Sequence, residues 1–162
     1  MHHLPKACTT CYNGLVKLFK QKPKWYVNGL AFECIECGKC CAGPEEGYVW
    51  ITDSEITALA ESLGLSEDET RAKYIRKIGR RQSLVEQKES NDCVFLTVDG
   101  VHGKGCSIYQ ARPVQCRTWP FWRSNLTTPA DWSIAGMRCA GINRGKLFSQ
   151  EEIESRANGT RE

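Results

Sequence analysis

Four cysteines lie within eight residues, in the segment FECIECGKCCAG at 32–43. Cys34, Cys37 and Cys40 form two overlapping Cys-x-x-Cys steps, a spacing that places thiolates around a metal ion or an iron–sulfur cluster. Cys41 follows Cys40 directly, and because neighbouring side chains diverge, we expect the two thiols to serve different coordination positions. The segment therefore predicts thiolate-bound metal.

The chain contains ten cysteines, four of which lie downstream in separate segments: Cys93, Cys106, Cys116 and Cys139. Its first residues include no continuous apolar stretch of the kind found in secretory signals, so we expect a cytoplasmic protein. In that reducing compartment cysteines bind metal more often than they form disulfides, which leaves a disulfide framework and merely buried thiols as alternatives. Cys8 and Cys11 form one further Cys-x-x-Cys pair, which is weak evidence for additional ligands.

A closed zinc site takes four ligands in tetrahedral geometry, often from two paired Cys-x-x-Cys steps, whereas the downstream cysteines here are single. Cys34, Cys37 and Cys40 are closer to the Cys-x-x-Cys-x-x-Cys run that binds three irons of a 4Fe–4S cluster. By analogy with that run, Cys116 is the favoured remote fourth ligand. The remaining four would form a second centre: Cys41, Cys93, Cys106 and Cys139. An iron–sulfur cluster or iron is therefore favoured, and two zinc sites remain the alternative because ligand softness does not separate them.

The segments that must position these cysteines include helices with recognisable first turns. Thr52 and Glu55 fit a capping box before an apolar stripe that stops at Gly64, which predicts a helix over 52–63. A second helix is predicted over 66–78, with acidic residues in its first turn and basic residues later, as the helix dipole favours. The two would pack together as a helical hairpin.

Strands and shorter helices are predicted in the second half of the chain. Residues 82–87 and 93–98 have strand composition, and we expect 93–109 to form a β-hairpin with a long loop. Helices are predicted to start at three further points: Arg112-Pro113, Thr128-Pro129 and the capping box of Ser149 with Glu152.

Aromatic and polar side chains stand beside the cysteines in the sequence. Trp119, Phe121 and Trp122 would either shield a metal site from water or form an ordinary aromatic core. Tyr109 and Arg112 are candidates to surround such a site rather than to act as catalysts.

The 162 residues are enough for one domain with a hydrophobic core, and 41% hydrophobic with 25% charged residues is ordinary for a globular protein. No apolar run approaches the roughly 20 residues that span a bilayer, so we expect no membrane association. We expect a small single α+β domain of several helices with a short antiparallel sheet, organised around cysteine-bound metal. Its parts would be an N-terminal lead-in at 1–29, a cysteine-cluster metal-binding domain at 30–145, and a short helix with a polar tail at 146–162.

Several independent motifs follow one another along the chain: FECIECGKCCAG at 32–43, VWIT at 49–52, DCVFL at 92–96, CSIY at 106–109, RPVQCRTWPFW at 112–122 and CAGI at 139–142. In this order they resemble the CxxCxxCC cysteine-cluster family, also called the YkgJ-like proteins or the zinc- or iron-chelating domain. The resemblance implies metal or iron–sulfur binding by eight cysteines: Cys34, Cys37, Cys40, Cys41, Cys93, Cys106, Cys116 and Cys139. Ala140 departs from the proline that is more common in the family after the last cysteine.

The function expected from these observations is metal binding, with a structural, electron-transfer or metal-handling role and with metal ions as partners. The first alternative is an Fe–S-dependent oxidoreductase, but the sequence defines no catalytic constellation and His102, the only histidine outside the N-terminus, stands in a predicted loop. The second is a zinc-stabilised interaction or nucleic-acid-binding module. Nucleic acid is not favoured, because paired zinc-finger spacing is missing and the net charge is only +3.

Overall fold

The computed structural model describes residues 23–98 and 103–160. Its helices are α1 (Asp53–Leu63), α2 (Glu67–Tyr74), α3 (Val114–Thr118), α4 (Arg123–Leu126), α5 (Pro129–Arg138) and α6 (Gln150–Gly159). Its strands are β1 (Leu30–Phe32), β2 (Ile75–Ile78), β3 (Arg81–Leu84), β4 (Leu96–Thr97), β5 (Gly105–Cys106) and β6 (Lys146–Phe148). Two short 3-10 turns cover Lys39–Cys41 and Tyr109–Ala111. The predicted small α+β domain with antiparallel strands is confirmed.

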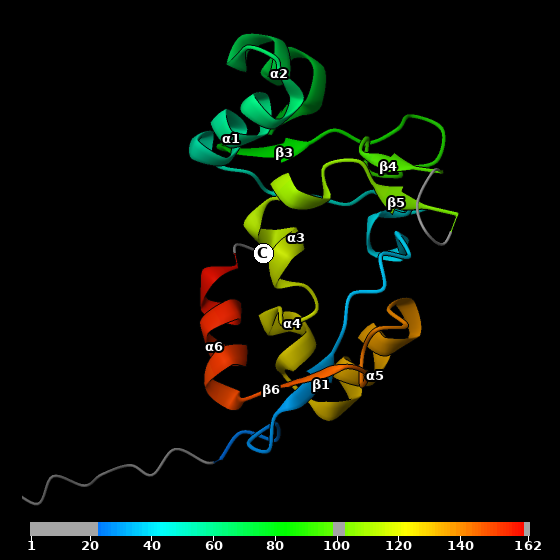
Figure 1. Cartoon of the computed structure of the whole chain (residues 1–162), viewed down its shortest axis with the longest axis vertical. Helices are drawn as coiled ribbons and strands as arrows, with labels where there is room; N and C mark the ends of the chain where they lie inside the picture. Colours follow the sequence, from blue (N-terminus) through cyan, green and yellow to red (C-terminus); the bar gives the residue numbers. More distant parts are fainter. Residues whose placement is uncertain (1–22, 99–102, 161–162) are drawn as a thin grey trace, which may run out of the picture.

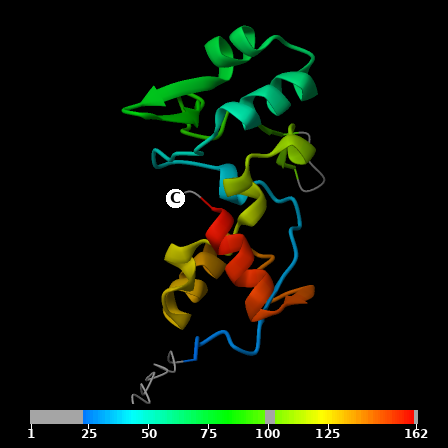
Figure 2. The same cartoon turned by 90° about the vertical axis from the view of Figure 1, so that its left-hand side faces the viewer.

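The strands pair in three separate two-stranded antiparallel ladders, β1–β6, β2–β3 and β4–β5, rather than in one sheet. The helices and ladders form two groups along the long axis of the molecule (Figure 1). The upper group in this view holds α1, α2 and the strands β2 to β5. The lower group holds β1, β6, α4, α5 and α6. The turned view in Figure 2 shows the same division, with α3 between the two groups.

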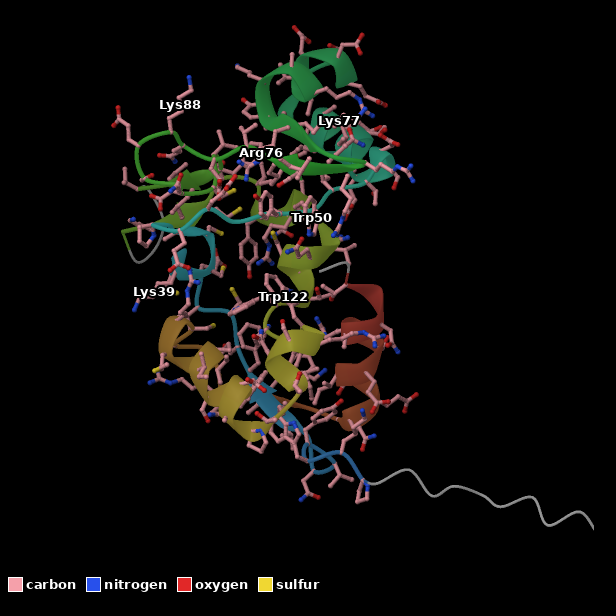
Figure 3. All side chains as sticks on the ribbon, turned by 180° about the vertical axis from the view of Figure 1, so that it is seen from behind. Lys39, Trp50, Arg76, Lys77, Lys88 and Trp122 are labelled. Atoms are coloured by element: carbon pink, nitrogen blue, oxygen red, sulfur yellow. The ribbon has the colours of Figure 1, made fainter. Side chains whose placement is uncertain are left out.

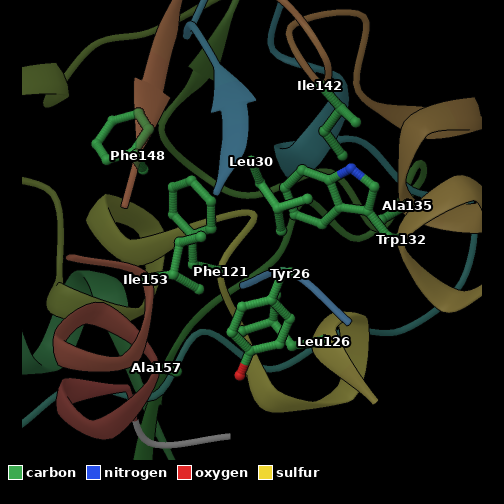
Figure 4. Close-up of a cluster of buried hydrophobic side chains, with 10 residues drawn as sticks. All are labelled: Tyr26, Leu30, Phe121, Leu126, Trp132, Ala135, Ile142, Phe148, Ile153 and Ala157. Atoms are coloured by element: carbon green, nitrogen blue, oxygen red, sulfur yellow. The ribbon is translucent and has the colours of Figure 1, made fainter. Parts of the chain in front are cut away.

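Each group has its own cluster of buried apolar side chains. The upper core consists of Ile51, Ile56, Leu59, Leu84, Phe95 and Ile108. The lower core, shown in Figure 4, consists of Tyr26, Leu30, Phe121, Leu126, Trp132, Ala135, Ile142, Phe148, Ile153 and Ala157. Because burial of apolar surface is the main stabilising term in folding, each core holds its own elements together. Whatever lies between the cores decides how firmly the two groups are joined.

The first helix begins as its sequence predicts. The Thr52 hydroxyl accepts a hydrogen bond from the Glu55 amide, and the Glu55 carboxylate accepts one from the Thr52 amide at 2.8 Å. The stripe of Ile56, Leu59 and Ala60 is buried, and Gly64 ends the helix in a left-handed conformation. The capping box and the apolar period therefore both operate as expected.

The second helix is shorter than predicted. It ends at Tyr74 instead of continuing to residue 78, and the sequence IRKI that follows forms strand β2. Ile75 pairs with Leu84, and Gly79 at φ 59° supports the two-residue turn between the strands. The prediction failed because β-branched residues that pair across a hairpin gain more there than in a short helix.

Most other local predictions are confirmed. Leu96 pairs with Cys106 in the expected hairpin. The helices α5 and α6 begin at Pro129 and Gln150, with Thr128 and Ser149 as their N-caps. The ladder of β1 with β6 was not predicted. It joins Leu30 to Phe148, and so distant a pairing of three-residue strands leaves little periodic signal in the sequence.

Candidate metal centre

The cysteine-rich segment crosses from one group of elements to the other. In Figure 1 it runs from β1, coloured blue, to the cyan turn beneath β5. Cys34 stands two residues after the end of β1, and Lys39–Cys41 form a 3-10 turn in which the Cys41 amide donates to the Gly38 carbonyl at 2.9 Å. The Cys93 amide then donates to the Cys41 carbonyl at 2.8 Å. The segment therefore reaches the upper group through direct backbone bonding.

Backbone contacts fix both ends of this segment. At its start the Glu33 amide donates to the Gly141 carbonyl at 3.1 Å, and at its end the Gly43 amide donates to the Asp92 carboxylate at 2.7 Å. A Cβ at Gly141 would collide with the Glu33 carbonyl oxygen, and one at Gly43 would collide with the Ser90 carbonyl oxygen. Glycine is required at both positions because backbones approach too closely for any side chain.

Gly141→Ala is therefore expected to push Glu33 and the neighbouring Cys34 away from the lower group, at a cost of about 1 to 3 kcal/mol in unfolding free energy. Gly159→Ala is the matched control, since nothing lies within 4 Å of a Cβ at that position. Denaturant unfolding of both variants measures the difference. Equal stability of the two variants would contradict the close approach at Gly141.

Two adjoining cavities bring the predicted ligands together. The larger, of about 240 Å³, is lined by Cys40, Cys41, Cys93, Cys106 and Cys116. The smaller, of about 40 Å³, is lined by Cys34, Cys37, Cys40, Cys41, Cys106, Cys116 and Cys139. All eight candidate cysteines thus line this pair of cavities, and four of them line both. Figure 3 shows the corresponding gathering of yellow sulfur atoms between the two groups, with Lys39 directed outward beside them.

The donor set suits a soft metal, but the thiols are not arranged as a finished site. Within residues 23–98 and 103–160, no group of three or more His, Cys, Asp or Glu side chains could hold a metal ion as it stands. The sulfurs of Cys40 and Cys41 are 3.8 Å apart. Metal binding would require thiols along the cavity walls to turn toward a common point, so the eight-cysteine ligand set stays a prediction. Cys8, Cys11 and His102 lie outside the described residues.

The grouping of the cysteines differs between the two cavities. Cys93 lines only the larger one, whereas Cys34, Cys37 and Cys139 line only the smaller one. The sequence-based pairing of Cys139 with Cys93 in a second centre, and of Cys116 with the compact run in a first, is likewise still a prediction.

The pKa values of these thiols differ from one cysteine to the next. The hydrogen bond from Cys41 lowers the pKa of Cys40 to about 7, and the guanidinium groups of Arg112 and Arg138 act in the same direction. The pKa of Cys41 is raised, because its thiol donates that hydrogen bond and is also buried. Burial raises the pKa of Cys93 to about 11. Of Cys40, Cys41 and Cys93, Cys40 is accordingly the thiol that most readily presents a thiolate to an incoming cation.

Burial also raises the pKa of Cys106 and of Cys116. A metal ion must displace the protons of such thiols, so metal affinity would fall as the pH is lowered. The charge of the two arginines partly offsets the repulsion among several thiolates in one small volume.

Tyr109 and Arg112, which stand near Cys106 and Cys116 in the sequence, lie beside Cys34 in the structure. The Arg112 guanidinium stacks over the Tyr109 ring at 3.6 Å, and its Nε donates to the Tyr109 carbonyl at 2.8 Å. A hydrogen bond with Cys34, followed by burial, raises the pKa of Tyr109. These two side chains therefore orient the first cysteine of the run.

The aromatic cluster divides between its two expected roles. Trp119 lines both cavities and Trp122 lines the larger one, whereas Phe121 is fully buried in the lower core. The rings of Trp119 and Trp122 meet edge to face, with their centroids 4.8 Å apart. The two tryptophans thus line the cysteine cavities, and the phenylalanine between them is core.

A link between α1 and α3 positions Cys116, and the sequence did not predict it. The Val114 amide, at the start of α3, donates to the Glu55 carboxylate at 2.6 Å. The buried side chain of Gln115 accepts from the Trp50 amide at 2.7 Å and donates to the Tyr48 carbonyl at 3.0 Å. The only sign of this link in the sequence is that Gln115, a polar residue, stands next to the candidate ligand Cys116.

The Glu55 link gives a pH-dependent contribution to stability. Burial alone would raise the pKa of Glu55, but the hydrogen bonds from Val114 and Thr52 outweigh it, so the pKa lies below its usual range. A lowered pKa means that the stabilisation is fully present above the unfolded value of about 4.3 and is lost as the pH falls through the folded value.

Glu55→Gln is expected to lower the unfolding free energy at pH 7 by about 1 kcal/mol, because a half-exposed charged acceptor is replaced by a neutral one. The loss of stability between about pH 5 and pH 3 should also become shallower than in the wild type. Urea unfolding across this range measures both effects. Glu61→Gln, on the exposed side of the same helix, serves as the control, and an identical pH profile for both variants would contradict the role of Glu55.

Comparison with other proteins identifies the family. Residues 33–143 match the family model CxxCxxCC, described as "Putative zinc- or iron-chelating domain". The chain is also 34% identical over 139 residues to a protein of Methanocaldococcus jannaschii named "Uncharacterized protein MJ0661", a match that covers 82% of this chain and 71% of the relative. No solved structure matches the chain.

None of the helices in the described ranges is long and apolar enough to cross a bilayer.

The family match spans every candidate ligand from Cys34 to Cys139 and leaves Cys8 and Cys11 outside it. The same eight cysteines line the two cavities. The chain belongs to the CxxCxxCC family of zinc- or iron-chelating domains.

Proposed function

We propose that the eight cysteines from Cys34 to Cys139 bind iron, as iron–sulfur clusters or as iron ions, in one shared centre between the two hydrophobic cores. The observation that carries this proposal is the sharing of four cysteines by both cavities: Cys40, Cys41, Cys106 and Cys116. Two mononuclear zinc sites would each take a closed set of four ligands. Thiols that do not separate into two such sets favour a shared polynuclear centre, and iron–sulfur clusters, each held by four thiolates, supply such a centre.

The positions of the cysteines support a structural role for this centre. Cys93 and Cys106 pack against the upper core, and Cys139 packs against the lower core. Cys116 belongs to α3, which lies between them. A metal held by all of these thiols would close a loop of about a hundred residues and would couple metal binding to folding.

Electron transfer is compatible with a structural role, because the metal centre stays bound while it gains and loses an electron. A bound iron–sulfur cluster supplies one-electron redox chemistry. The chain itself supplies Arg112 and Arg138, whose positive charges lie near the Cys40 thiol, and Trp119 and Trp122, which line the cavities. Release of metal to another protein would sacrifice the link between the cores, so metal handling is the less favoured role.

Anaerobic purification followed by iron, zinc and acid-labile sulfide analysis tests the proposal, together with absorption spectroscopy. We expect iron and sulfide in the protein and visible absorption bands that disappear on chelation. Stoichiometric zinc without iron would overturn the choice of metal while leaving thiol coordination intact. Protein that contains neither metal, and whose folding ignores chelators, would overturn the proposal as a whole.

A further inference from the structure

Seven residues separate the two cysteine cavities, because they line both: Cys40, Cys41, Cys106, Arg112, Cys116, Trp119 and Arg138. Six of them have an evident place in the proposed centre, as thiols or as positive charges beside thiols. Trp119 is the exception. Its ring packs against the lower core and against Trp122, which accounts for its apolar part but not for its indole N–H.

The indole N–H of Trp119 is buried, and no hydrogen-bond partner for it exists among the described residues. Three other tryptophans satisfy theirs: Trp25 donates to the Leu126 carbonyl, Trp122 to the Gln115 carbonyl and Trp132 to the Asn143 amide oxygen, each at 2.9 Å. Buried tryptophan N–H groups are normally paired in this way, because leaving such a donor without an acceptor is costly. The exception therefore points to an acceptor that belongs to the loaded site.

The chemistry of the shared wall identifies that acceptor. Arg112 and Arg138 carry only donors, whereas the cysteines carry sulfur. A neutral thiol is a weak acceptor, but an ionised one accepts a considerably stronger, charge-assisted hydrogen bond. Metal binding ionises the thiols and can bring inorganic sulfide with it, so it creates strong sulfur acceptors in the two cavities that Trp119 lines.

We propose that the Trp119 indole N–H donates a hydrogen bond to a sulfur of the metal centre, either a cysteine thiolate or a bound sulfide. This inference rests on the proposed function. Trp119 is in this sense a positioning and tuning residue rather than a ligand. Hydrogen bonds to cluster sulfurs stabilise the more negative, reduced state, so this bond would raise the reduction potential of an iron–sulfur centre.

The direct test is NMR of protein labelled with ¹⁵N at tryptophan, recorded on the anaerobically purified, metal-loaded protein and again after chelation. Trp119→Phe identifies the signal of Trp119 by its absence. We expect this signal to move further on metal removal than those of Trp25, Trp122 and Trp132, whose acceptors are carbonyl or amide oxygens. A Trp119 signal that stays in place in protein shown to lose its metal would overturn the inference and leave the proposed function standing.

A second measurement uses the reduction potential of the iron-loaded protein. Trp119→Phe should shift the potential to a more negative value, and Trp122→Phe is the matched control because it removes an equal volume and an N–H that is already bonded to a backbone carbonyl. Equal shifts in both variants would indicate a packing or solvent effect and would overturn the inference. Should the wild type hold no metal at all, both the proposed function and this bond are excluded; for a zinc-loaded protein the NMR comparison alone decides.

Discussion

Cys116→Ser is expected to weaken metal binding by at least about 100-fold, because loss of a residue that only supports a ligand already costs about 10- to 100-fold. The protein should be destabilised correspondingly by about 3 kcal/mol. Cys116 lines both cavities, and α3 places it between the two cores. Its replacement therefore removes sulfur from the point where the two cavities meet. Serine keeps the size of the side chain but supplies a hard oxygen in place of a soft thiolate.

Metal content after purification and urea unfolding of the loaded protein measure this effect. Cys8→Ser is the control of identical chemistry, since Cys8 lies outside the residues that match the family. The control should retain wild-type loading and stability. Wild-type metal content in Cys116→Ser would contradict the assignment of Cys116, whatever the control shows.

Removing the metal by chelation is expected to lower the melting temperature by about 6 to 12 °C or more. Loss of about 3 kcal/mol or more of binding energy, at about 2 to 4 °C per kcal/mol for a chain of this size, gives this figure. We further expect the single unfolding transition to split in two. The upper and lower cores are separate clusters of buried side chains, and α3 and the cysteine segment lie between the two groups.

Differential scanning calorimetry with and without chelator measures both changes, and restoring the metal provides the control for irreversible damage. Hydrogen exchange adds a local measurement, because the Cys41 and Cys93 amides are bonded to the carbonyls of Gly38 and Cys41 and should lose protection on chelation before the lower core does. An unchanged melting temperature in protein proven to have lost its metal would contradict the structural role.

The parts of this fold that the sequence predicts are those set by neighbouring residues. The capping boxes at Thr52 and Ser149 lie within four consecutive residues each, and helices begin there in the structure. The hairpin that pairs Leu96 with Cys106 is almost as local. In the same way the spacing of Cys34, Cys37 and Cys40 predicts thiolate coordination without knowledge of the fold.

What the sequence does not predict depends on distant contacts. The pairing of Leu30 with Phe148, and the hydrogen bond from Val114 to Glu55, join segments whose proximity only the tertiary structure creates. The division into two cores is of the same kind, because apolar periodicity shows which face of an element is buried but not which other elements it meets. The unpaired indole N–H of Trp119 likewise emerges only from the packing around it.

The most direct test of the central claim is differential alkylation of the cysteines, mapped by peptide mass spectrometry, in metal-loaded and chelated protein. Cys34 and Cys40 are exposed and the other six candidates are half-buried, so without metal the first two should react fastest. We predict that all eight cysteines from Cys34 to Cys139 are protected in the loaded protein and become reactive on chelation, whereas Cys8 and Cys11 react in both states. Equal labelling of Cys34 and Cys40 with and without bound metal would contradict a single centre formed by these eight thiols.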